Sequence, residues 1–446
     1  MTTKVSSSKT MAEQRRSNRS RHTKFHVFTT VCLIAIIFTY MFNTNTFVSN
    51  ISFNFTPNTT IPFLSVNLLD NQTFIVNQLK STSTLHNPVL IVKEVIVQKS
   101  VSEDDQNPLV PPINLTKKQR MSWFKNKLPE FDMLNSNQEF EIRAKEFFQD
   151  CNVRFFMTWI SSPLRVFGKR EFLAVDALFK SNPESCLMIL SNVMDSDFGF
   201  QTLKPIIDRG FRVQALTPDL NFLFKNTPAK SWFDHIKNGN RDPGEIPLAQ
   251  NLSNLIRLVV LYKFGGVYLD TDFIPLKDFS GLRNSIGAQS VNSLGNWTRL
   301  NNAVLIFDKN HPLLYKFIEE FALTFNGNRW GFNGPYLVSR VVEREATELE
   351  SNFTVLPPLA FYPVDWTRIG GLFLRPVNQA HRKWAETKAA QIKESSYGIH
   401  LWNKQSRRFR IEEESIMARL ISEHCVICKF FKKSQRLSHN SFSISS

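Results

Sequence analysis

The 446-residue chain carries a formal charge of +15 but lacks the pattern expected of a nucleic-acid-binding protein. Residues 1–24 hold seven Lys or Arg and one Glu, and therefore contribute +6 of that charge. After them there is no stripe in which basic and aromatic residues alternate, as needed to bind phosphates and bases. We therefore expect no nucleic-acid partner. The hydrophobic content of 42% is sufficient for the core of a folded enzyme.

Charged residues are absent from residues 25–42, FHVFTTVCLIAIIFTYMF. As a helix this segment would be about 27 Å long, enough to cross a thin bilayer. The basic residues before it favour a cytosolic N-terminus. The small-x-small site that a cleaved signal peptide needs does not follow it. We therefore predict a cytosolic tail (1–24) and a transmembrane signal-anchor (25–42) of a single-pass type II membrane protein, with a cleaved signal peptide as the alternative.

Cysteine is scarce, with only five residues in the chain. Cys32 lies in the apolar segment, which leaves Cys151, Cys186, Cys425 and Cys428 for the rest. Cys425 and Cys428 form a single C-x-x-C, and no second such pair completes a zinc ligand set. Structural disulfides are therefore favoured over a zinc or redox site. Of the possible pairings, we predict one that joins Cys425 or Cys428 to Cys151 or Cys186.

Eight N-x-S/T sequons support a lumenal location for the rest of the chain. They begin at Asn50, Asn54, Asn58, Asn71, Asn114, Asn251, Asn296 and Asn352. Residues 43–148 are rich in Ser, Thr, Asn, Pro and Val with little helical period, which predicts a lumenal stem. A globular domain is then expected at 149–430, followed by a C-terminal tail at 431–446.

Short apolar runs alternate with amphipathic segments after residue 150. Residues 153–161, 186–191 and 211–216 predict buried strands, and residues 168–181 and 200–209 predict the helices between them. This alternation is typical of an α/β domain with a largely parallel sheet. In such open sheets, ligands bind beyond the carboxyl ends of the strands.

Two D-x-D pairs occur in this region, Asp195 with Asp197 and Asp270 with Asp272. Spacing alone does not distinguish them, and an arbitrary D-x-D simply ends a strand in a turn. If both acids lie on one side of a strand, however, their carboxylates repel each other unless a cation lies between them. The sequence around each pair must therefore decide between a turn and a metal site.

The second pair has the more informative surroundings. Residues 248–264 carry an apolar stripe at helical spacing, and Gly265 can adopt the positive φ of a helix end. Gly266 lets the backbone turn, so that VYLDTD places Asp270 and Asp272 at the carboxyl end of a strand. We therefore favour these two acids as the ligands of Mg²⁺ or Mn²⁺, which would also bind substrate phosphates.

Five motifs in order carry a family resemblance. LYKFGGVYLDTDFIPLKDF, RLNNAVLIF, WGFNGPYLVSRV, LPPLAFYPVDW and YGIHLWNK resemble the family 32 glycosyltransferases, especially their α1,4-galactosyltransferase and α1,4-N-acetylglucosaminyltransferase branch. The resemblance covers about residues 153–428. It implies a GT-A (Rossmann-like) domain, a UDP-sugar donor, a divalent cation, retention of anomeric configuration and a Golgi type II location.

The implied reaction is transfer of a hexose or N-acetylhexosamine, galactose or N-acetylglucosamine in α1,4 linkage, to a glycan or glycolipid acceptor. The alternative is a sugar-binding or scaffold protein of the Golgi that keeps the fold without turnover. Carried over from the family's D-x-D, Asp270 and Asp272 are the catalytic residues, with Asp272 the direct metal ligand. His400 and Asn403 of H-x-W-N would complete the metal site. An imidazole beside carboxylates favours Mn²⁺ over Mg²⁺, although a lone histidine is more often structural.

The same resemblance assigns residues to the donor and the acceptor. Those expected at the donor are Trp159, Arg257, Gly265, Gly266, Asn301, Asn333 and Gly334. Trp159 would stack on uracil, or else pack in the core, and Arg257 would meet the donor, or else be a solvent-exposed helix arginine. Asn254 stands where family members commonly have Asp, which weakens the hold on a sugar hydroxyl. Trp330 offers an apolar face for a sugar ring, with ordinary packing as the alternative.

Overall fold

The computed structural model describes residues 110–130, 133, 139–162, 165–349 and 353–428. The predicted cytosolic tail, signal-anchor and C-terminal tail lie outside these residues, as does most of the predicted stem. Within the described ranges, every helix is too short or too polar to span a bilayer.

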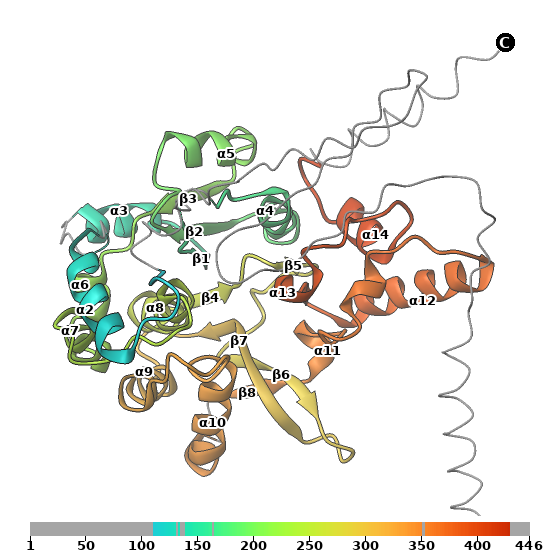
Figure 1. Cartoon of the computed structure of the whole chain (residues 1–446). Coiled ribbons are helices and arrows are strands. Elements are labelled where there is room, and N and C mark those ends of the chain that lie inside the picture. Colours follow the sequence, from blue (N-terminus) through green and yellow to red (C-terminus); the bar gives the residue numbers. More distant parts are fainter. Residues whose placement is uncertain (1–109, 131–132, 134–138, 163–164, 350–352, 429–446) are drawn as a thin grey trace, which may run out of the picture. The chain divides into compact units, whose positions relative to one another are not determined.

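A mixed seven-stranded sheet with the order β3-β2-β1-β4-β7-β6-β8 forms the centre of the domain (Figure 1). Its strands are β1 (Val153–Trp159), β2 (Ser185–Ser191), β3 (Arg212–Leu216), β4 (Gly266–Leu269), β6 (Ser285–Val291), β7 (Trp297–Phe307) and β8 (Thr354–Leu356). Strands β1 to β4 are parallel, whereas β7 is antiparallel to both β4 and β6. The predicted α/β domain is confirmed, with β7 as the antiparallel strand of a largely parallel sheet.

Two hydrophobic cores cover the two faces of this sheet. Phe155 and Met157 of β1 belong to one core and Phe156 to the other, because successive side chains of a strand point to opposite faces. The Phe156 face is covered by α2 (Lys117–Lys127), η2 (Leu128–Glu130), α3 (Glu139–Phe147), α6 (Leu220–Phe224), α7 (Pro228–Lys237), α8 (Leu248–Phe264), α9 (Pro312–Thr324) and α10 (Pro335–Leu349).

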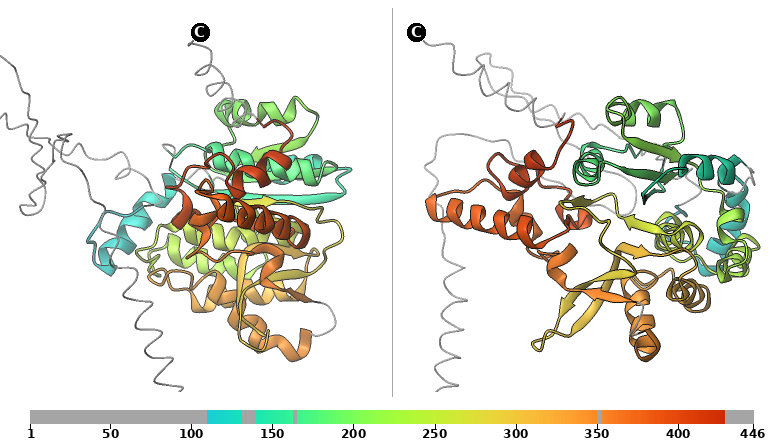
Figure 2. Two further views of the ribbon diagram at one scale, coloured as in Figure 1. Left: turned by 90° about the vertical axis from the view of Figure 1, so that its right-hand side faces the viewer. Right: turned by 180° about the vertical axis from the view of Figure 1, so that it is seen from behind.

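The opposite face carries the remaining elements. They are α4 (Lys169–Ser181), α5 (Asp197–Ile207), α11 (Pro358–Phe361), η4 (Ile369–Leu372), α12 (Gln379–Ser395), α13 (Asn403–Ser406), α14 (Ile416–Glu423) and the two-stranded sheet of β5 (Phe273–Pro275) and β9 (Gly398–His400). Figure 1 shows α6 to α9 on the left of the central strands and α11 to α14 on the right, and the view from behind in Figure 2 shows the same separation.

The folded domain begins earlier than the sequence predicts. Helices α2 and α3 fall within the predicted stem, yet Phe124 and Phe140 from these helices are buried in the core. Arg120 of α2 also forms a 2.7 Å ion pair with Asp242. Their apolar residues are few, so the helical period is weak, and only distant packing partners make these helices stable. The stem prediction is therefore wrong for the described residues before 149.

The predicted disulfide pairing is also wrong, because neither bond joins the end of the domain to its first strands. Cys151 bonds to Cys186, and Cys425 bonds to Cys428. Strands β1 and β2 pair in parallel with Arg154 opposite Cys186, so the chain just before β1 lies beside the start of β2. The two bonds use all four cysteines of the described residues, so no cysteine there is left to join the end of the domain to β1.

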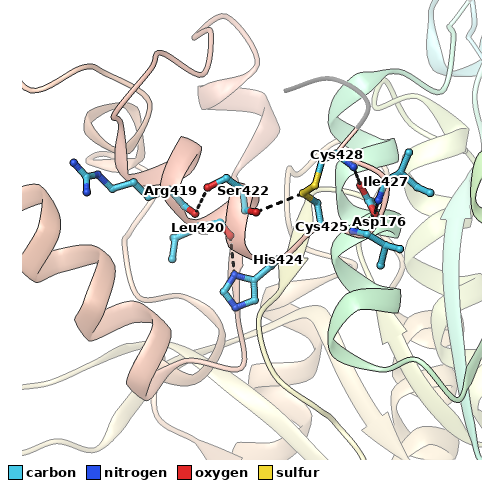
Figure 3. Close-up of a disulfide and its surroundings, with 9 residues drawn as sticks. Asp176, Arg419, Leu420, Ser422, His424, Cys425, Ile427 and Cys428 are labelled. Carbon is cyan, nitrogen blue, oxygen red and sulfur yellow. Dashed lines mark hydrogen bonds between the residues drawn. A yellow bond between two sulfur atoms is a disulfide. The ribbon is translucent and has the colours of Figure 1, made fainter. Parts of the chain in front are cut away.

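A buried carboxylate of helix α4 holds residues 426–428 instead. Asp176 of α4 is fully buried, and its Oδ1 accepts hydrogen bonds from the backbone N–H groups of Val426 and Ile427 at 2.7 and 2.9 Å. Its Oδ2 accepts one from Cys428 at 3.1 Å. Figure 3 shows this carboxylate facing the turn closed by the disulfide. The last described turn is thus fixed to α4 by hydrogen bonds to a charged group, which are stronger than neutral ones.

The sequons in the described residues differ in exposure. Asn114 and Asn296 are exposed, as glycan acceptors must be. Asn251 lies in α8 with 2% of its surface exposed, and its Oδ1 accepts a hydrogen bond from Asn333 at 2.9 Å. A glycan on Asn251 is incompatible with this packing, so that sequon is corrected to a structural asparagine.

Candidate active site

The order of the strands in the sheet indicates where a ligand would bind. From β1 the chain continues to β2 and then β3 on one side, and β4 lies on the other side of β1. Strand order therefore reverses between β1 and β4, and ligands of open α/β sheets bind at such a point beyond the carboxyl ends. The residues at these ends are Trp159 of β1 and Asp270, which directly follows β4.

Asp270 and Asp272 meet His400 at this position. The two acids lie in a turn between β4 and β5 rather than on one strand, and the N–H of Phe273 donates to the carbonyl of Asp270 at 3.0 Å. Strand β5 pairs with β9, which sets Phe273 opposite His400. His400 Nε2 lies 3.2 Å from Asp272 Oδ1 and 3.8 Å from Asp270 Oδ2.

One ligand atom from each of these three residues lies within 4.8 Å of the others, so they can share one cation. The set contains carboxylate oxygens and an imidazole nitrogen, which suit Mn²⁺. Burial lowers the pKa of His400, but the charges and hydrogen bonds of Asp272 and Asp270 together outweigh it and raise the pKa of His400 to about 9. Burial raises the pKa of Asp272, but the charge and hydrogen bond of His400 and the backbone N–H donors together outweigh it, and the net shift is downward.

A buried arginine orients Asp270. Arg257 of α8 is only 3% exposed, and its Nη2 lies 3.0 Å from Asp270 Oδ1. Its Nη1 donates to the carbonyl of Asn302 at 2.7 Å, and its Nε donates to that of Ser253 at 3.1 Å. The alternative interpretation, a solvent-exposed helix arginine, is therefore excluded, and the predicted contact of Arg257 with the donor stays a prediction. Arg257 acts on the site through Asp270, which it both neutralises and holds in place.

The phenol of Tyr268 supports the same carboxylate. Its O–H donates to Asp270 Oδ1 at 2.9 Å, and Arg257 lies over its ring with 4.5 Å between the guanidinium carbon and the ring centroid. Burial raises the pKa of Tyr268, so this hydroxyl stays protonated and remains a donor. The sequence motif VYLDTD contains Tyr268, but nothing in its spacing identifies this role.

Asp272 is held from the other side by α13. The backbone N–H of Asn403 donates to Asp272 Oδ2 at 2.8 Å. The side-chain oxygen of Asn403 lies 3.3 Å from Arg170 Nη1, so a guanidinium already engages it. Arg170 also donates from Nη1 to Ser406 Oγ at 2.9 Å and from Nη2 to the carbonyl of Ser406 at 2.8 Å. Asn403 therefore contributes a backbone donor, and metal ligation by its side chain stays a prediction.

Two buried polar atoms at the carboxyl end of β1 have no partner among the described residues. They are Nε1 of Trp159 and Oγ of Ser161, whose residues are 7% and 5% exposed. Buried polar groups are nearly always hydrogen-bonded, so such orphans call for an explanation. The ring of Trp159 lies beside Phe167 and under the guanidinium of Arg165. The sequence prediction missed Ser161, because a serine after a strand carries no distinctive signal.

The predicted glycines shape the backbone. Gly265 ends α8 with φ of 66°, and Gly266 begins β4 with φ of 121°. A Cβ on Gly266 would lie 2.4 Å from the carbonyl oxygen of Arg154 in β1. Since Asp270 follows the other end of β4, about 13 Å away at the usual rise, these glycines position the strand and do not line the acid cluster.

The predicted asparagines make hydrogen bonds within the protein. Asn301 of β7 donates from Nδ2 to Gln289 at 2.9 Å, and its Oδ1 accepts from the N–H of Ala303. Asn254 accepts from Nδ2 of Asn302 at 2.9 Å. A Cβ on Gly334 would lie 2.9 Å from Oδ1 of Asn254, so Gly334 permits a close approach of its loop.

Asn333 holds the same loop by hydrogen bonds to Asn326 and Asn251. Its side chain is 2% exposed, and its Nδ2 donates to Asn251 and to the carbonyl of Asn326 at 2.9 and 2.8 Å. Its Oδ1 accepts from the N–H of Asn326 at 3.0 Å. Asn333 thus ties the loop to α8, and its predicted contact with the donor stays a prediction.

Comparison with known proteins agrees with this geometry. Residues 168–292 match the glycosyltransferase sugar-binding region containing DXD motif, and residues 306–430 match the alpha 1,4-glycosyltransferase conserved region. Lactosylceramide 4-alpha-galactosyltransferase of Mus musculus is 30% identical over 272 residues, which are 56% of this chain and 68% of that protein. Alpha-1,4-N-acetylglucosaminyltransferase of Homo sapiens is 26% identical over 219 residues, 46% of this chain and 58% of that protein.

Other matches are more distant. An uncharacterized protein of Arabidopsis thaliana is 28% identical over 289 residues, which are 63% of this chain but only 43% of that protein. Among solved structures, PaToxG glycosyltransferase aligns over 48% of this chain and 78% of that one, with 19% identity and a TM-score of 0.34.

The sugar-binding region and the acid cluster define a protein of the DXD glycosyltransferase class. Within that class, the chain belongs to the α1,4-glycosyltransferase family, as the sequence resemblance predicted.

Proposed function

We propose that the protein is a retaining α-glycosyltransferase with a GT-A domain, which transfers a hexose or N-acetylhexosamine from a UDP-sugar to a glycan or glycolipid. The observation that carries the proposal is the convergence of Asp270, Asp272 and His400 beyond the carboxyl end of β4. The names of the relatives favour galactose or N-acetylglucosamine in α1,4 linkage. The apolar segment 25–42 and the sequons favour a Golgi membrane location with the catalytic domain in the lumen.

The acid cluster fits manganese (Mn²⁺) as its resident cation. When bound there, the cation would stabilise the negative charge on the departing diphosphate. The chain's own residues hold the acids in place for it: Arg257 orients Asp270, and the N–H of Asn403 orients Asp272. Both acids are thus fixed before a substrate arrives, which is the condition for electrostatic catalysis.

The donor nucleotide would lie beside the end of β1. There, Nε1 of Trp159 and Oγ of Ser161 offer a donor and a hydroxyl that lack protein partners in the described residues. This position is next to β4 in the sheet, so a diphosphate extending from a nucleotide bound there would point toward Asp270 and Asp272.

Hydrolysis of a UDP-sugar panel by the purified full-length protein in detergent tests this function. We expect UDP release from UDP-galactose or UDP-N-acetylglucosamine with Mn²⁺, its loss in excess chelator, and an α-anomeric product when acceptor is added. Full activity in chelator would contradict the metal mechanism, and a β-linked product would contradict retention.

A catalytically weak sugar-binding or scaffold protein is the second candidate, and Asn254 favours it. The family commonly has Asp at this position, whereas here the amide is bonded to Asn302 and is uncharged. A scaffold would bind UDP and Mn²⁺ without releasing free sugar from any donor in the panel. Turnover with any donor would therefore reject this candidate.

A further inference from the structure

One side of the loop of residues 326–334 packs against α8 and β7. Asn333 bonds to Asn251 of α8, and Gly334 lies against the side chains of Asn254 and Asn302. These contacts place the loop next to the helix that carries Arg257, the partner of Asp270. The loop is thus preformed rather than ordered by a ligand.

On its outer side the loop presents an indole. Trp330 is 56% exposed, and the Nζ atom of Lys404 lies 3.8 Å from its ring centroid. Lys404 belongs to α13, from the opposite face of the sheet, and follows Asn403, whose N–H donates to Asp272. The indole and the acid cluster are therefore joined through two consecutive residues of one short helix.

This pairing leaves the indole available to a ligand. An ammonium over an exposed ring is a weak contact, because water competes for the charge. A pyranose ring has one face of C–H groups, which packs on an indole once the ammonium moves aside. The site thus offers an apolar platform with a movable polar group at its edge.

We propose that Trp330 is the platform on which the acceptor's sugar ring stacks, and that Lys404 covers it in the free protein. That the bound sugar is the acceptor rests on the proposed function, but binding of a sugar to Trp330 does not require turnover. The ring contacts Lys404 of α13, and the neighbouring Asn403 bonds to Asp272, so a sugar stacked on the ring would lie on the α13 side of the domain.

Titration of methyl β-lactoside and methyl β-N-acetyllactosaminide into the full-length protein, followed by saturation-transfer NMR, tests the platform directly. Trp330→Ala should weaken binding about tenfold or more, equal to about 1.4 kcal/mol, and Trp330→Phe should restore most of it. Lys404→Ala should bind no more weakly than the wild type. The matched control is Trp384→Ala, because Trp384 is 49% exposed on α12 and its ring contacts His381 instead.

Mn²⁺ binding should be unchanged in all four variants, and donor hydrolysis should be unchanged in Trp384→Ala. Equal glycoside affinity in Trp330→Ala and Trp384→Ala would overturn the platform, as would a wild type that binds neither glycoside. A loss of Mn²⁺ binding in Trp330→Ala, or a tenfold loss of glycoside binding in Lys404→Ala, would overturn it too. If the wild type binds glycoside through Trp330 but hydrolyses no donor, the platform stands and the proposed transferase function fails.

Discussion

The molecule contains two D-x-D pairs with identical spacing and different surroundings. Asp195 accepts two hydrogen bonds from Arg143, at 2.8 and 3.1 Å, and one from the N–H of Thr217 at 2.9 Å. Its partner Asp197 is exposed in the first turn of α5, where a carboxylate is stabilised by the helix dipole. The first pair is therefore divided between two structural roles, and its carboxylates do not share a site.

Asp270 and Asp272 instead converge on His400, from a segment more than a hundred residues away. Each acid has its own supporting donor, and each keeps an oxygen within reach of the imidazole. The D-x-D spacing alone therefore does not make a metal site. The second pair can bind a cation because the fold adds a third ligand, His400, and gives each acid its own hydrogen-bond donor.

The largest expected difference between the pairs is in turnover. Asp272→Asn should lower kcat by about 100- to 1,000-fold, because a preorganised charge at the reacting diphosphate is lost. Asp195→Asn should keep activity within about twofold, since that acid only supports a loop. Donor hydrolysis of both purified variants measures this. Equal losses would show that the first pair belongs to the site as well.

The arginines of the two pairs should differ in stability. Arg257→Ala removes the buried partner of Asp270 and should cost about 3 kcal/mol, more than a hundredfold in the folding equilibrium. Arg143→Ala should cost about 1 kcal/mol or less, because both members of that pair are partly exposed, at 32% and 20%. Urea unfolding of each variant gives these values. A larger cost for Arg143→Ala would contradict the assignment of burial.

Without His400, the Asp270–Asp272 pair should bind a cation only weakly. His400→Ala leaves both acids and should weaken Mn²⁺ affinity about 10- to 100-fold. Calorimetric titration at constant pH measures it, with His381→Ala, at a half-buried position in the first turn of α12, as the control. An unchanged Mn²⁺ affinity in His400→Ala would show that His400 does not bind the cation.

The smallest expected effect is on pH dependence. His400 has a pKa raised to about 9 in the metal-free protein, so Mn²⁺ must displace a proton from it below that pH. The apparent affinity should therefore rise with pH by about tenfold per unit between pH 6.5 and 8.5. Titration in buffers of different ionisation enthalpy measures the released proton. A flat profile in that range would contradict ligation through the imidazole.

Much of the frame around the second pair was predictable from sequence. The apolar stripe of α8, its end at Gly265 and the acids after β4 all lie within one continuous stretch, so local pattern was sufficient. The alternation of strands and helices after residue 150 likewise predicted the sheet. His400 was found only through the family motif, since a single histidine has no local signature.

The supports of the site were not predictable, because they depend on distant contacts. The burial of Arg257 follows from its packing under β7, and the bond from Arg170 to Ser406 joins residues far apart in the chain. The orphan Oγ of Ser161 is visible only once burial is known. The Cys151–Cys186 disulfide was missed for the same reason, because the pairing of β1 with β2, which sequence does not show, brings these cysteines together.

The electron paramagnetic resonance signal of free Mn²⁺ measures cation binding to the wild type, Asp272→Asn and Asp195→Asn. This measurement decides whether the fold makes a cation site of the second D-x-D pair only. We predict that the wild type and Asp195→Asn remove the free-ion signal with one site of equal affinity, whereas Asp272→Asn leaves it nearly unchanged. Undiminished binding by Asp272→Asn, or loss of binding in Asp195→Asn alone, would contradict the account.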